Sequence, residues 1–468
     1  MKDFVLEHAG KKPVSFHMPG HKGSDIFKHY GYENYLDSLI DCDITEIPGA
    51  DNLFQAEGII RDVQSRYQDL YGVERSYLLV NGTSGGIIAS ILASVKPGHK
   101  LVMARNCHKS VFNALELGGI EPVYARPEII DEYGISGEVT PDEIKRCLSE
   151  NPDADAVILP SPNYYGIVSD IEGIADAVHD AGKILIVDQA HGAHLKFFHK
   201  FGFGDDMPLC AEDSGADITI NSIHKTLASI TQSAVLNFNT NRVDRYILED
   251  KLQMIETSSP SYIMMTFLDI NAEILEKHGE EAIGNWNENL KWFERQLDNM
   301  PIKVVKRDNL DKTKINISLG NYGLSGAELE EELNNRGIYP ELYAGDILML
   351  MTGIGNSRED FERTIAALEE IIKDREVCGE REKFEGITAG LRKQAVMHGV
   401  PADKEYVPLD EAIGRVCGSS IIPYPPGIPL VCPGEEITDE AVEYVKELRN
   451  RGEKVIGVND RGEVVVGI

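Results

Sequence analysis

The alternation of short apolar strands with helical stretches between residues 73 and 240 constrains the fold of this chain most. The apolar segments are "SYLLV" (76–80), "KLVMA" (100–104), "DAVILP" (155–160), "KILIVD" (183–188) and "ITINS" (218–222). Strands of this kind, separated by helices, form a mainly parallel sheet that is covered on both faces. The sequence therefore predicts an α/β fold whose ligands bind beyond the carboxyl ends of the strands.

Length, charge and cysteine content narrow the possibilities further. A chain of 468 residues exceeds one compact core and should form several domains. The net charge of −31 argues against nucleic acid as a partner and favours a small cationic substrate, although a solvated acidic surface would explain the same charge. Seven scattered cysteines without a CxxC pair, and no apolar run long enough for a membrane span, predict a cytoplasmic protein with no membrane partner.

Shifts in composition predict four units along the chain. They are an N-terminal arm (1–50), a large domain that binds the cofactor (51–295), a smaller α+β domain (296–378) and a C-terminal α+β domain (379–468). The charged stretch 374–386 marks the last junction, and the segment 454–468 is typical of a closing hairpin.

The segment "LLVNGTSGG" (78–86) joins a strand to a helix through a glycine-rich turn. Glycines such as Gly85 let the backbone approach an anion, N–H groups at the helix start point toward it, and Thr83 and Ser84 add hydroxyl donors. The Walker and dinucleotide-binding motifs are both absent. The turn predicts a phosphate site, with an ordinary capped turn as the alternative.

Two strand ends carry the residues that pyridoxal phosphate requires. Asp188 ends one apolar strand, and Lys225 follows the next strand 37 residues later (225 minus 188). Such a lysine binds the cofactor as an imine, and such an aspartate keeps the pyridine nitrogen protonated. Ser222 and His224, beside the lysine, can reach the phosphate. A helix-capping aspartate and a surface lysine are the alternatives, but their occurrence together with the glycine turn favours the cofactor site.

Three further side chains belong to the expected cofactor site. Asn163, in a Pro-Asn turn, is placed to donate to the cofactor's phenolic oxygen, and His108, after a strand, to stack on its ring. A plain turn and a plain helix start are the alternatives for these two residues. His191 is the third expected contact. Its spacing to His194 also permits a metal, but because a third ligand is missing we predict no metal site.

Seven motifs together resemble those of the ornithine/lysine/arginine decarboxylases, a group of fold-type I (aspartate-aminotransferase-like) pyridoxal-phosphate enzymes. They are "FHMPGHKG" (16–23), "NGTSGG" (81–86), "NCHKS" (106–110), "DQAHGAH" (188–194), "SIHKTL" with "TQSA" (222–234), "SSPSYIMM" (258–265) and "PYPPGIPL" (423–430). The resemblance runs from about residue 13 to the end. It is to the short form of the family, without the receiver-like domain of longer members.

The resemblance implies a seven-stranded large-domain sheet, a homodimer or larger homo-oligomer, and a role for each residue. Lys225, Asp188 and His108 would be catalytic, holding the cofactor, supporting its pyridinium and stacking on its ring. Ser258 would enter the site from the partner subunit. The phosphate would contact Thr83, Ser84, Ser222 and His224.

The reaction that the resemblance implies is decarboxylation of a basic amino acid. Arginine, which gives agmatine and CO2, is favoured over lysine and ornithine, and polyamine biosynthesis is the expected role. A pyridoxal-phosphate aminotransferase or lyase and an inactive regulatory homologue are the alternatives. The candidate substrate contacts are His17, His21, Lys22, Glu341 and Ser419. Ser419 stands where members of the family often carry a carboxylate or an amide.

Overall fold

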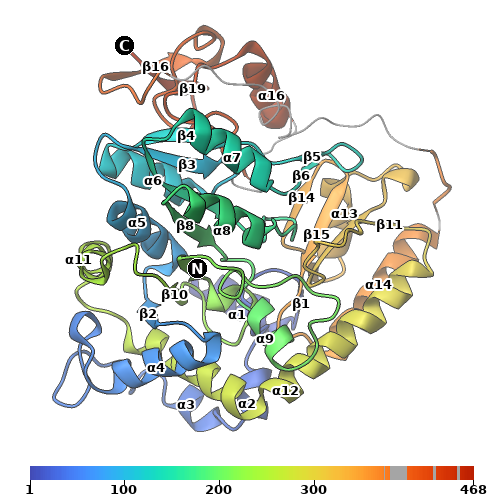
Figure 1. The fold of residues 1–468 in the computed structure, drawn as a ribbon. Helices are drawn as coiled ribbons and strands as arrows, with labels where there is room; N and C mark the ends of the chain where they lie inside the picture. Colours follow the sequence, from blue (N-terminus) through green and yellow to red (C-terminus); the bar gives the residue numbers. More distant parts are fainter. Residues whose placement is uncertain (374, 380–397, 425–427, 451–453) are drawn as a thin grey trace.

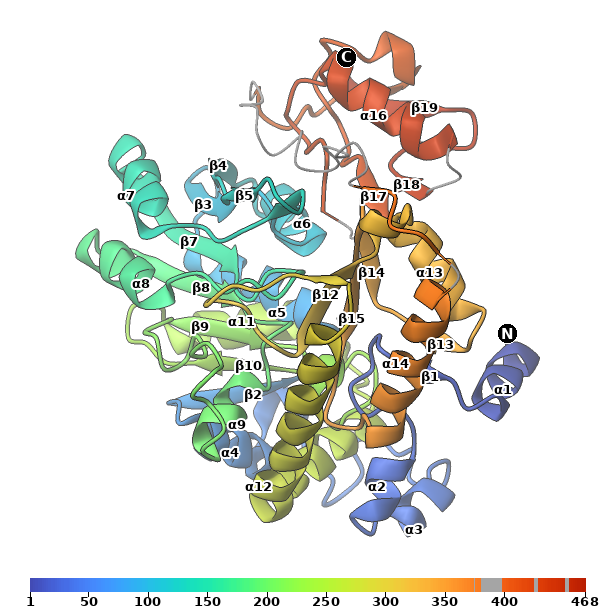
Figure 2. The same ribbon diagram turned by 90° about the vertical axis from the view of Figure 1, so that its right-hand side faces the viewer.

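The computed structural model describes residues 1–373, 375–379, 398–424, 428–450 and 454–468. It contains a central sheet with helices on both faces, a smaller sheet domain and a C-terminal unit (Figures 1 and 2). The predicted junction at 374–386 lies largely outside the described residues, as do residues 425–427 of "PYPPGIPL". The limits of the four predicted units stay predictions.

Seven strands form the central sheet in the order β2-β10-β9-β8-β7-β3-β4. Their bounds are β2 Arg75–Leu79, β3 Lys100–Ala104, β4 Glu121–Ala125, β7 Ala154–Pro160, β8 Ile184–Asp188, β9 Ile218–Asn221 and β10 Ala234–Phe238. The strands from β9 to β4 are parallel, and β10 runs antiparallel to both of its neighbours. The predicted mainly parallel, seven-stranded sheet is confirmed, and most residues of its central strands are buried and apolar because helices cover both faces.

The covering helices begin and end at recognisable local signals. Thr140 caps α7 by accepting a hydrogen bond from the Glu143 N–H, and Gly72 ends α4 in the left-handed conformation. The helices of the large domain are α4 Ile59–Tyr71, α5 Gly82–Ser94, α6 Lys109–Gly118, α7 Pro141–Glu150, α8 Ile171–Asp180, α9 Leu195–Lys200, α10 Ile223–Thr226, α11 Arg245–Ile255 and α12 Tyr262–Asp298. Among the described residues, no helix has the length and apolar character needed to cross a membrane.

The smaller domain is an antiparallel sheet in the order β11-β12-β15-β14, packed against α13 and α14 (Figure 2). Its elements are β11 Lys303–Val304, β12 Lys314–Ser318, η2 Gly320–Tyr322, α13 Gly326–Asn334, β13 Ile338–Tyr339, β14 Leu342–Ala344, β15 Ile347–Met351 and α14 Arg358–Lys373. A short hairpin of the large domain, β5 Ile129–Ile130 with β6 Ile135–Ser136, packs on the same apolar cluster as β14 and β15.

The C-terminal unit has its own apolar core and is docked on the β3–β4 edge of the central sheet (Figure 1). Its elements are β16 Lys404–Pro408, η3 Leu409–Glu411, β17 Ile422–Tyr424, α16 Asp439–Asn450, β18 Lys454–Ile456 and β19 Glu463–Gly467. The predicted hairpin at 454–468 is wrong in its pairing. β18 pairs with β17 and β19 pairs with β16, and a single bridge, Val458 to Val464, joins the two arms.

The N-terminal arm is threaded between the large and the small domain. It comprises α1 Lys2–Gly10, which has no buried residue, β1 Val14–Ser15, which pairs with β13, α2 Asp25–His29 and α3 Glu33–Asp37. The short helix η1 Leu53–Gln55 follows the arm. The Gly20 N–H donates to the His224 carbonyl at 2.6 Å, and the Gly20 carbonyl accepts from the Gly355 N–H at 3.0 Å. A Cβ at Gly20 would lie 2.3 Å from the carbonyl carbon of Thr226, so this position requires glycine.

Candidate active site

The carboxyl ends of β3, β8 and β9 bring the predicted catalytic residues together. Asp188 is the last residue of β8, Lys225 lies in α10 directly after β9, and His108 caps α6 after β3. Parallel neighbours end at the same edge of a sheet, so residues that are distant in sequence meet there. The structure thus brings Asp188, Lys225 and His108 to one edge of the sheet, and their catalytic roles stay predictions.

Lys225 and His191 form the central contact of the cluster. The Lys225 Nζ atom lies 2.9 Å from His191 Nε2. Burial lowers the pKa of Lys225, against the opposing charge of Asp188, and burial together with Lys225 lowers the pKa of His191 well below its ordinary value. His191 is therefore neutral and accepts from the lysine through Nε2. Its Nδ1 atom then carries the proton, and this buried donor has no hydrogen-bond partner.

Asp188 is buried without a cation bonded to it. Among the described residues its carboxylate accepts one hydrogen bond, from the Ala190 N–H at 3.1 Å, and forms no ion pair. Burial raises the pKa of Asp188, although the charge of Lys225 opposes this shift. The carboxylate can therefore accept further hydrogen bonds, and a ligand that donates one would stabilise its buried charge. A protonated ring nitrogen is such a donor.

The glycine-rich turn begins α5. The side chain of its N-cap residue, Asn81, makes no capping hydrogen bond, and the Ser222 hydroxyl donates to Thr83 Oγ1 at 3.2 Å, which joins the end of β9 to this turn. Ser84 and Gly85 continue the same helical turn. Uncapped N–H groups with adjacent hydroxyls form an anion site, so the geometry supports the predicted phosphate contacts.

Glu256 holds this turn from behind and was not foreseen from the sequence. Its Oε2 atom accepts from the N–H groups of Val80 (3.2 Å) and Asn81 (2.9 Å), while Oε1 is buried and unpaired. Burial raises the pKa of Glu256 to about 7. A Cβ at Gly85 would lie 3.1 Å from Oε1, so the small residue leaves room for the carboxyl group.

The other two histidines of the cluster are neutral as well. Burial, with Lys225 as the next contribution, lowers the pKa of His108 to about 3, and its Nδ1 atom faces the Ser110 hydroxyl at 2.8 Å. Burial lowers the pKa of His224 to about 4. Since His224 Nδ1 donates to the Ser233 carbonyl at 2.9 Å, its Nε2 atom would have to take up a proton in order to donate to a phosphate.

Asn163 is committed to its own turn. Its Nδ2 atom donates to the carbonyls of Ser136 and Gly137 at 2.9 and 3.0 Å, and its Oδ1 atom accepts from Tyr165 and Ile167. Both amide hydrogens are used, so a bond to the cofactor would require breaking one of these contacts. The geometry argues against the predicted contact and favours the turn alternative.

In the described part of the chain, neither Ser258 nor Ser419 has a hydrogen bond to the cluster. Ser258 is exposed in the loop between α11 and α12, two residues after Glu256, and its predicted role across a subunit interface stays a prediction. Ser419 is exposed in the C-terminal unit, and its carbonyl accepts from Cys417 Sγ at 3.0 Å. Among the described residues, the bonds of Ser419 stay within that unit, so nothing supports a substrate contact.

The arm places its motif beside the cluster. The Lys22 Nζ atom donates to the His17 carbonyl at 2.5 Å and to the Met351 carbonyl at 3.1 Å, and burial lowers the pKa of Lys22 to about 7. Burial also lowers the pKa values of His17 and His21. His17 and Lys22 therefore mainly hold the arm through backbone contacts, and His21 Nδ1 likewise bonds to the Gly23 backbone.

Glu341 is the carboxylate from the small domain that reaches this region. Its Oε2 atom accepts from the Met18 N–H at 2.9 Å, and its charge acts on both Lys22 and Lys225. A half-buried carboxylate near the reactive lysine is suited to bind the distal cation of a basic substrate.

His191 and His194 do not converge on one point. His194 Nε2 bonds to Asp311 Oδ1 at 3.1 Å, and its Nδ1 atom faces the Thr226 hydroxyl at 3.2 Å, whereas His191 faces Lys225. Across the described parts of the chain, no group of three histidine, cysteine or acidic side chains is arranged to hold a metal ion.

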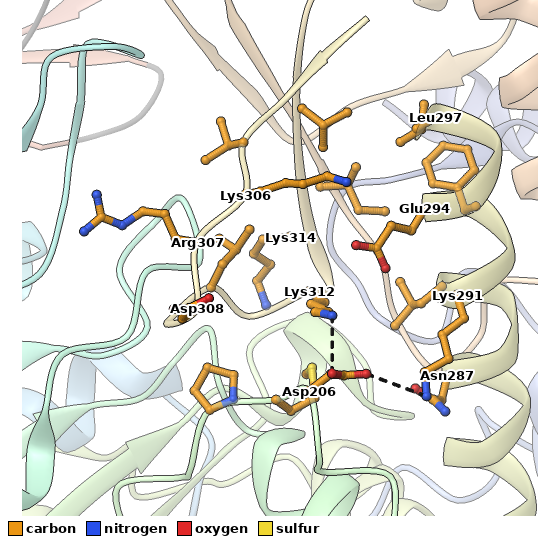
Figure 3. A pocket seen from close by; sticks show the side chains of 18 of the residues that line it. Asp206, Asn287, Lys291, Glu294, Leu297, Lys306, Arg307, Asp308, Lys312 and Lys314 are labelled. Atoms are coloured by element: carbon orange, nitrogen blue, oxygen red, sulfur yellow. Dashed lines mark ion pairs between the residues drawn. The ribbon is translucent and has the colours of Figure 1, made fainter. Parts of the chain in front are cut away.

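A cavity of about 530 Å³ lies behind the cluster, between α12 and the loop that leads into β12 (Figure 3). Its rim is charged, and Lys291 and Lys312 each lie 3.9 Å from a carboxylate oxygen of Asp206. Lys314 also lines the cavity, but its ammonium is fully buried and reaches the His191 carbonyl at 2.6 Å. The sequence reasoning missed Lys314 and its ion-pair partner Asp311.

The fold of this chain is that of the fold-type I pyridoxal-phosphate enzymes. The structure of a constitutive lysine decarboxylase from E. coli superposes with a TM-score of 0.76 over 96% of this chain and 79% of that chain, at 18% identity. A serine palmitoyltransferase from Sphingomonas wittichii gives a TM-score of 0.55 over 69% of this chain and 79% of that chain, at 14% identity. At these identities the likeness shows the fold alone, and the predicted fold class is confirmed.

Sequence comparison adds the family, and the chain belongs to the Orn/Lys/Arg decarboxylases. Residues 1–318 match the model for "Orn/Lys/Arg decarboxylase, major domain", and residues 386–461 match the model for the C-terminal domain of the same enzymes. The chain is 34% identical to the uncharacterized protein YaaO of Bacillus subtilis (strain 168), over 95% of this chain and 93% of that protein. It is 33% identical to an arginine decarboxylase of the same strain, over 97% of this chain and 94% of that protein. The predicted resemblance and the decarboxylase class are confirmed.

Proposed function

We propose that this protein decarboxylates arginine to agmatine and CO2 with pyridoxal phosphate as cofactor. The observation that carries the proposal is the buried cluster of Asp188, His191 and Lys225, in which the lysine has a lowered pKa and the carboxylate has spare acceptor capacity. The relatives named arginine decarboxylase, at 29–33% identity, support arginine, whereas those named lysine decarboxylase are 21% identical.

The residues present fit the cofactor. The unpaired Nδ1 donor of His191, the spare acceptor capacity of Asp188 and the uncapped start of α5 are what a group with a ring nitrogen and a phosphate would satisfy. Lys225 would hold the group covalently, and His108 would lie against its ring. Thr83, Ser84, Gly85 and Ser222 would bind the phosphate. When bound, pyridoxal phosphate supplies a protonated ring that takes up the electron pair left by departing CO2.

The chain's own groups then have defined tasks. Asp188 holds the ring proton, because a carboxylate beside the nitrogen stabilises the charged form. A proton can move between Lys225 Nζ and His191 Nε2, which lie 2.9 Å apart, and either atom can return it to the substrate's α-carbon. The lowered pKa of Lys225 keeps a larger share of its amine unprotonated and nucleophilic at neutral pH.

Two further features support a cationic substrate. Glu341 presents a half-buried carboxylate near Lys225, and the net charge of −31 attracts cations over a longer range. A guanidinium pairs with a carboxylate through two parallel hydrogen bonds, which an ammonium cannot form. This difference in geometry is the physical basis on which Glu341 would favour arginine over lysine or ornithine.

An aminotransferase of this fold holds the substrate's α-carboxylate with an arginine late in the small domain. The arginines between residues 337 and 374 both have other contacts, although one guanidinium nitrogen of Arg358 is buried without a hydrogen-bond partner among the described residues. Arg358 stacks over Trp292 at 4.8 Å, and Arg363 donates to the Lys12 carbonyl at 3.4 Å. We also propose that the active form is at least a homodimer, because Ser258 is exposed in a loop where it can reach a second subunit. A place in polyamine biosynthesis within the cytoplasm is the corresponding physiological proposal.

The test is to measure CO2 release and amine formation with arginine, lysine and ornithine separately, after loading with pyridoxal phosphate. We expect agmatine from arginine as the main product, and none from Lys225→Ala. The control is Lys145→Ala, an exposed lysine on α7 whose nearest acid, Asp142, is 3.9 Å away. Equal turnover of the three amino acids would refute the arginine assignment, and full activity of Lys225→Ala would refute the site.

A further inference from the structure

Lys314 is a lysine of the small domain whose side chain is completely buried, and it bonds both to its own domain and to the large one. Its Nζ atom donates to the His191 carbonyl (2.6 Å), to Asp311 Oδ2 (2.9 Å) and to Thr313 Oγ1 (3.1 Å). Three acceptors match the three donor hydrogens of an ammonium group, so the cation is fully satisfied. A fully buried lysine is rare and requires such pairing.

The position of Lys314 is fixed by the loop that precedes α8. A Cβ at Gly166 would lie 2.7 Å from Lys314 Cβ, so the strand backbone and the loop are in direct contact there. The Asn316 side chain, two residues along β12, donates to the Tyr165 carbonyl at 2.8 Å. The strand is therefore held against the large domain on both sides of Lys314.

The ion-pair partner of Lys314 also holds the turn that carries His191. Asp311 is fully buried and accepts from Thr313 and, through Oδ1, from His194 Nε2 at 3.1 Å. Burial alone would raise the pKa of Asp311, but His194 and Lys314 hold it below its ordinary value. The 189–194 turn is thus held by hydrogen bonds at two points. Lys314 bonds to the His191 carbonyl, and Asp311 bonds to the His194 ring.

We propose that Lys314 is a positioning residue of the candidate site: its buried ammonium holds the 189–194 turn and keeps a fixed positive charge behind His191, so that His191 remains the neutral acceptor of Lys225. The proposal rests on the proposed function, because it takes Lys225 as the reactive amine. The positive charge of Lys314 lowers the pKa of His191 and also lowers the pKa of Lys225.

Other charged and titratable groups face Lys314 and this cluster from the elements packed around them. They are Lys22, His108, Tyr164, Asp188, His194, Asp311 and Glu341. Burial lowers the pKa of Lys225 most, Asp188 and Glu341 raise it, and Lys314 adds to the lowering. Removal of Lys314 therefore shifts the balance toward a protonated Lys225.

The test compares Lys314→Met and Lys314→Arg with Lys312→Met. Lys312 is two residues away, 38% exposed and loosely paired with Asp206, so it controls for loss of a lysine at the same cavity (Figure 3). Pyridoxal phosphate is added to cofactor-free protein, and its affinity and the pH midpoint of the absorbance change of the protein-bound cofactor are measured. Neither readout depends on turnover.

We expect the midpoint of Lys314→Met to rise by about one pH unit, which is a tenfold change in proton affinity. Lys314→Arg, which keeps the charge, and Lys312→Met should keep the midpoint of the unmodified protein. If Lys314→Met does not fold, Asp311→Asn/Lys314→Met removes both buried charges and should show the same upward shift. A variant in which the charge is lost and the midpoint is unchanged would overturn the proposal, and so would an equal shift in Lys314→Arg.

The design separates this proposal from the proposed function. A protein that binds pyridoxal phosphate with the expected midpoints but releases no CO2 from arginine would refute the substrate and leave the role of Lys314 supported. Absence of a pH-dependent cofactor band in the unmodified protein would overturn both.

Discussion

Gly20→Ala should detach the N-terminal arm from the segment that carries Lys225. The added Cβ would meet Thr226 C, Thr226 Cα and Leu227 N at 2.3, 2.6 and 2.7 Å, and these are backbone atoms that no side-chain rotation can move. Relief requires the arm to shift, which lengthens the hydrogen bonds from Gly20 to His224 and from Gly355 to Gly20. Overpacking costs about 1–3 kcal/mol and each hydrogen bond about 1 kcal/mol, so we expect a loss of about 3–5 kcal/mol in the free energy of unfolding.

Urea unfolding followed by tryptophan fluorescence measures this loss. Trp286 is buried and donates to Thr352 Oγ1 at 3.0 Å. Thr352 lies three residues before Gly355, which bonds to Gly20, so the emission of Trp286 reports on the place where the arm is held. Gly10→Ala is the matched control, because a Cβ there meets nothing within 4 Å. Gly23→Ala, with φ of +126° and open space, separates backbone strain from collision. An unfolding midpoint of Gly20→Ala equal to that of Gly10→Ala would refute the reasoning.

Three further changes test other contacts. Asp188→Asn keeps the shape of the side chain but loses the charge that stabilises a ring proton, so turnover should fall by orders of magnitude, while a mild effect would mean that another group supports the ring. Burial raises the pKa of Glu256 from its ordinary value of 4.5 to about 7. The folded protein therefore loses stability as pH rises from about 4.5 to about 7, because the carboxyl group ionises more readily in the unfolded chain. Glu256→Gln should remove that decline in the thermal midpoint, and an unchanged pH profile would contradict it. Arg105 forms a buried two-point ion pair with Glu435 at 2.8–2.9 Å, so Arg105→Met should lower the free energy of unfolding by about 3–5 kcal/mol and speed proteolysis of the C-terminal unit. Lys404→Met, at an exposed pair with Glu116, should lower it by at most about 1 kcal/mol. Equal effects of the two variants would count against this account.

The sheet and the cluster on it were predictable because the strands are continuous apolar runs that end in polar residues. In "KILIVDQAHGAH" the change from apolar to polar at Asp188 marks the strand end, and the same holds for "ITINS" before Lys225. Parallel pairing then places both ends at one edge, so the meeting of Asp188 and Lys225 follows from the pattern.

The network around Lys314 was not predictable, because β12 alternates in the ordinary way. In "KINISL" the apolar residues at 315, 317 and 319 define one face, and the pattern assigns Lys314 and Asn316 to solvent. The face that carries Lys314 and Asn316 instead packs against the large domain, at the 189–194 turn and the loop at 163–168. There both side chains are buried and form hydrogen bonds. The contacts of Asn163 were not predictable either, because both of its amide hydrogens bond to nearby backbone carbonyls and neither is left for a cofactor.

The threading of the arm has a consequence for the order in which the chain can assemble. The segments that hold the arm are residues 224–227 and 338–355, so during synthesis the arm must wait for segments made more than 200 and 300 residues after it. Contacts of such sequence separation form late and slowly, since the intervening chain must be closed first. During synthesis the arm therefore stays unpaired with these segments, and the side of residues 224–227 that it covers stays open until the small domain has been translated and the arm can dock.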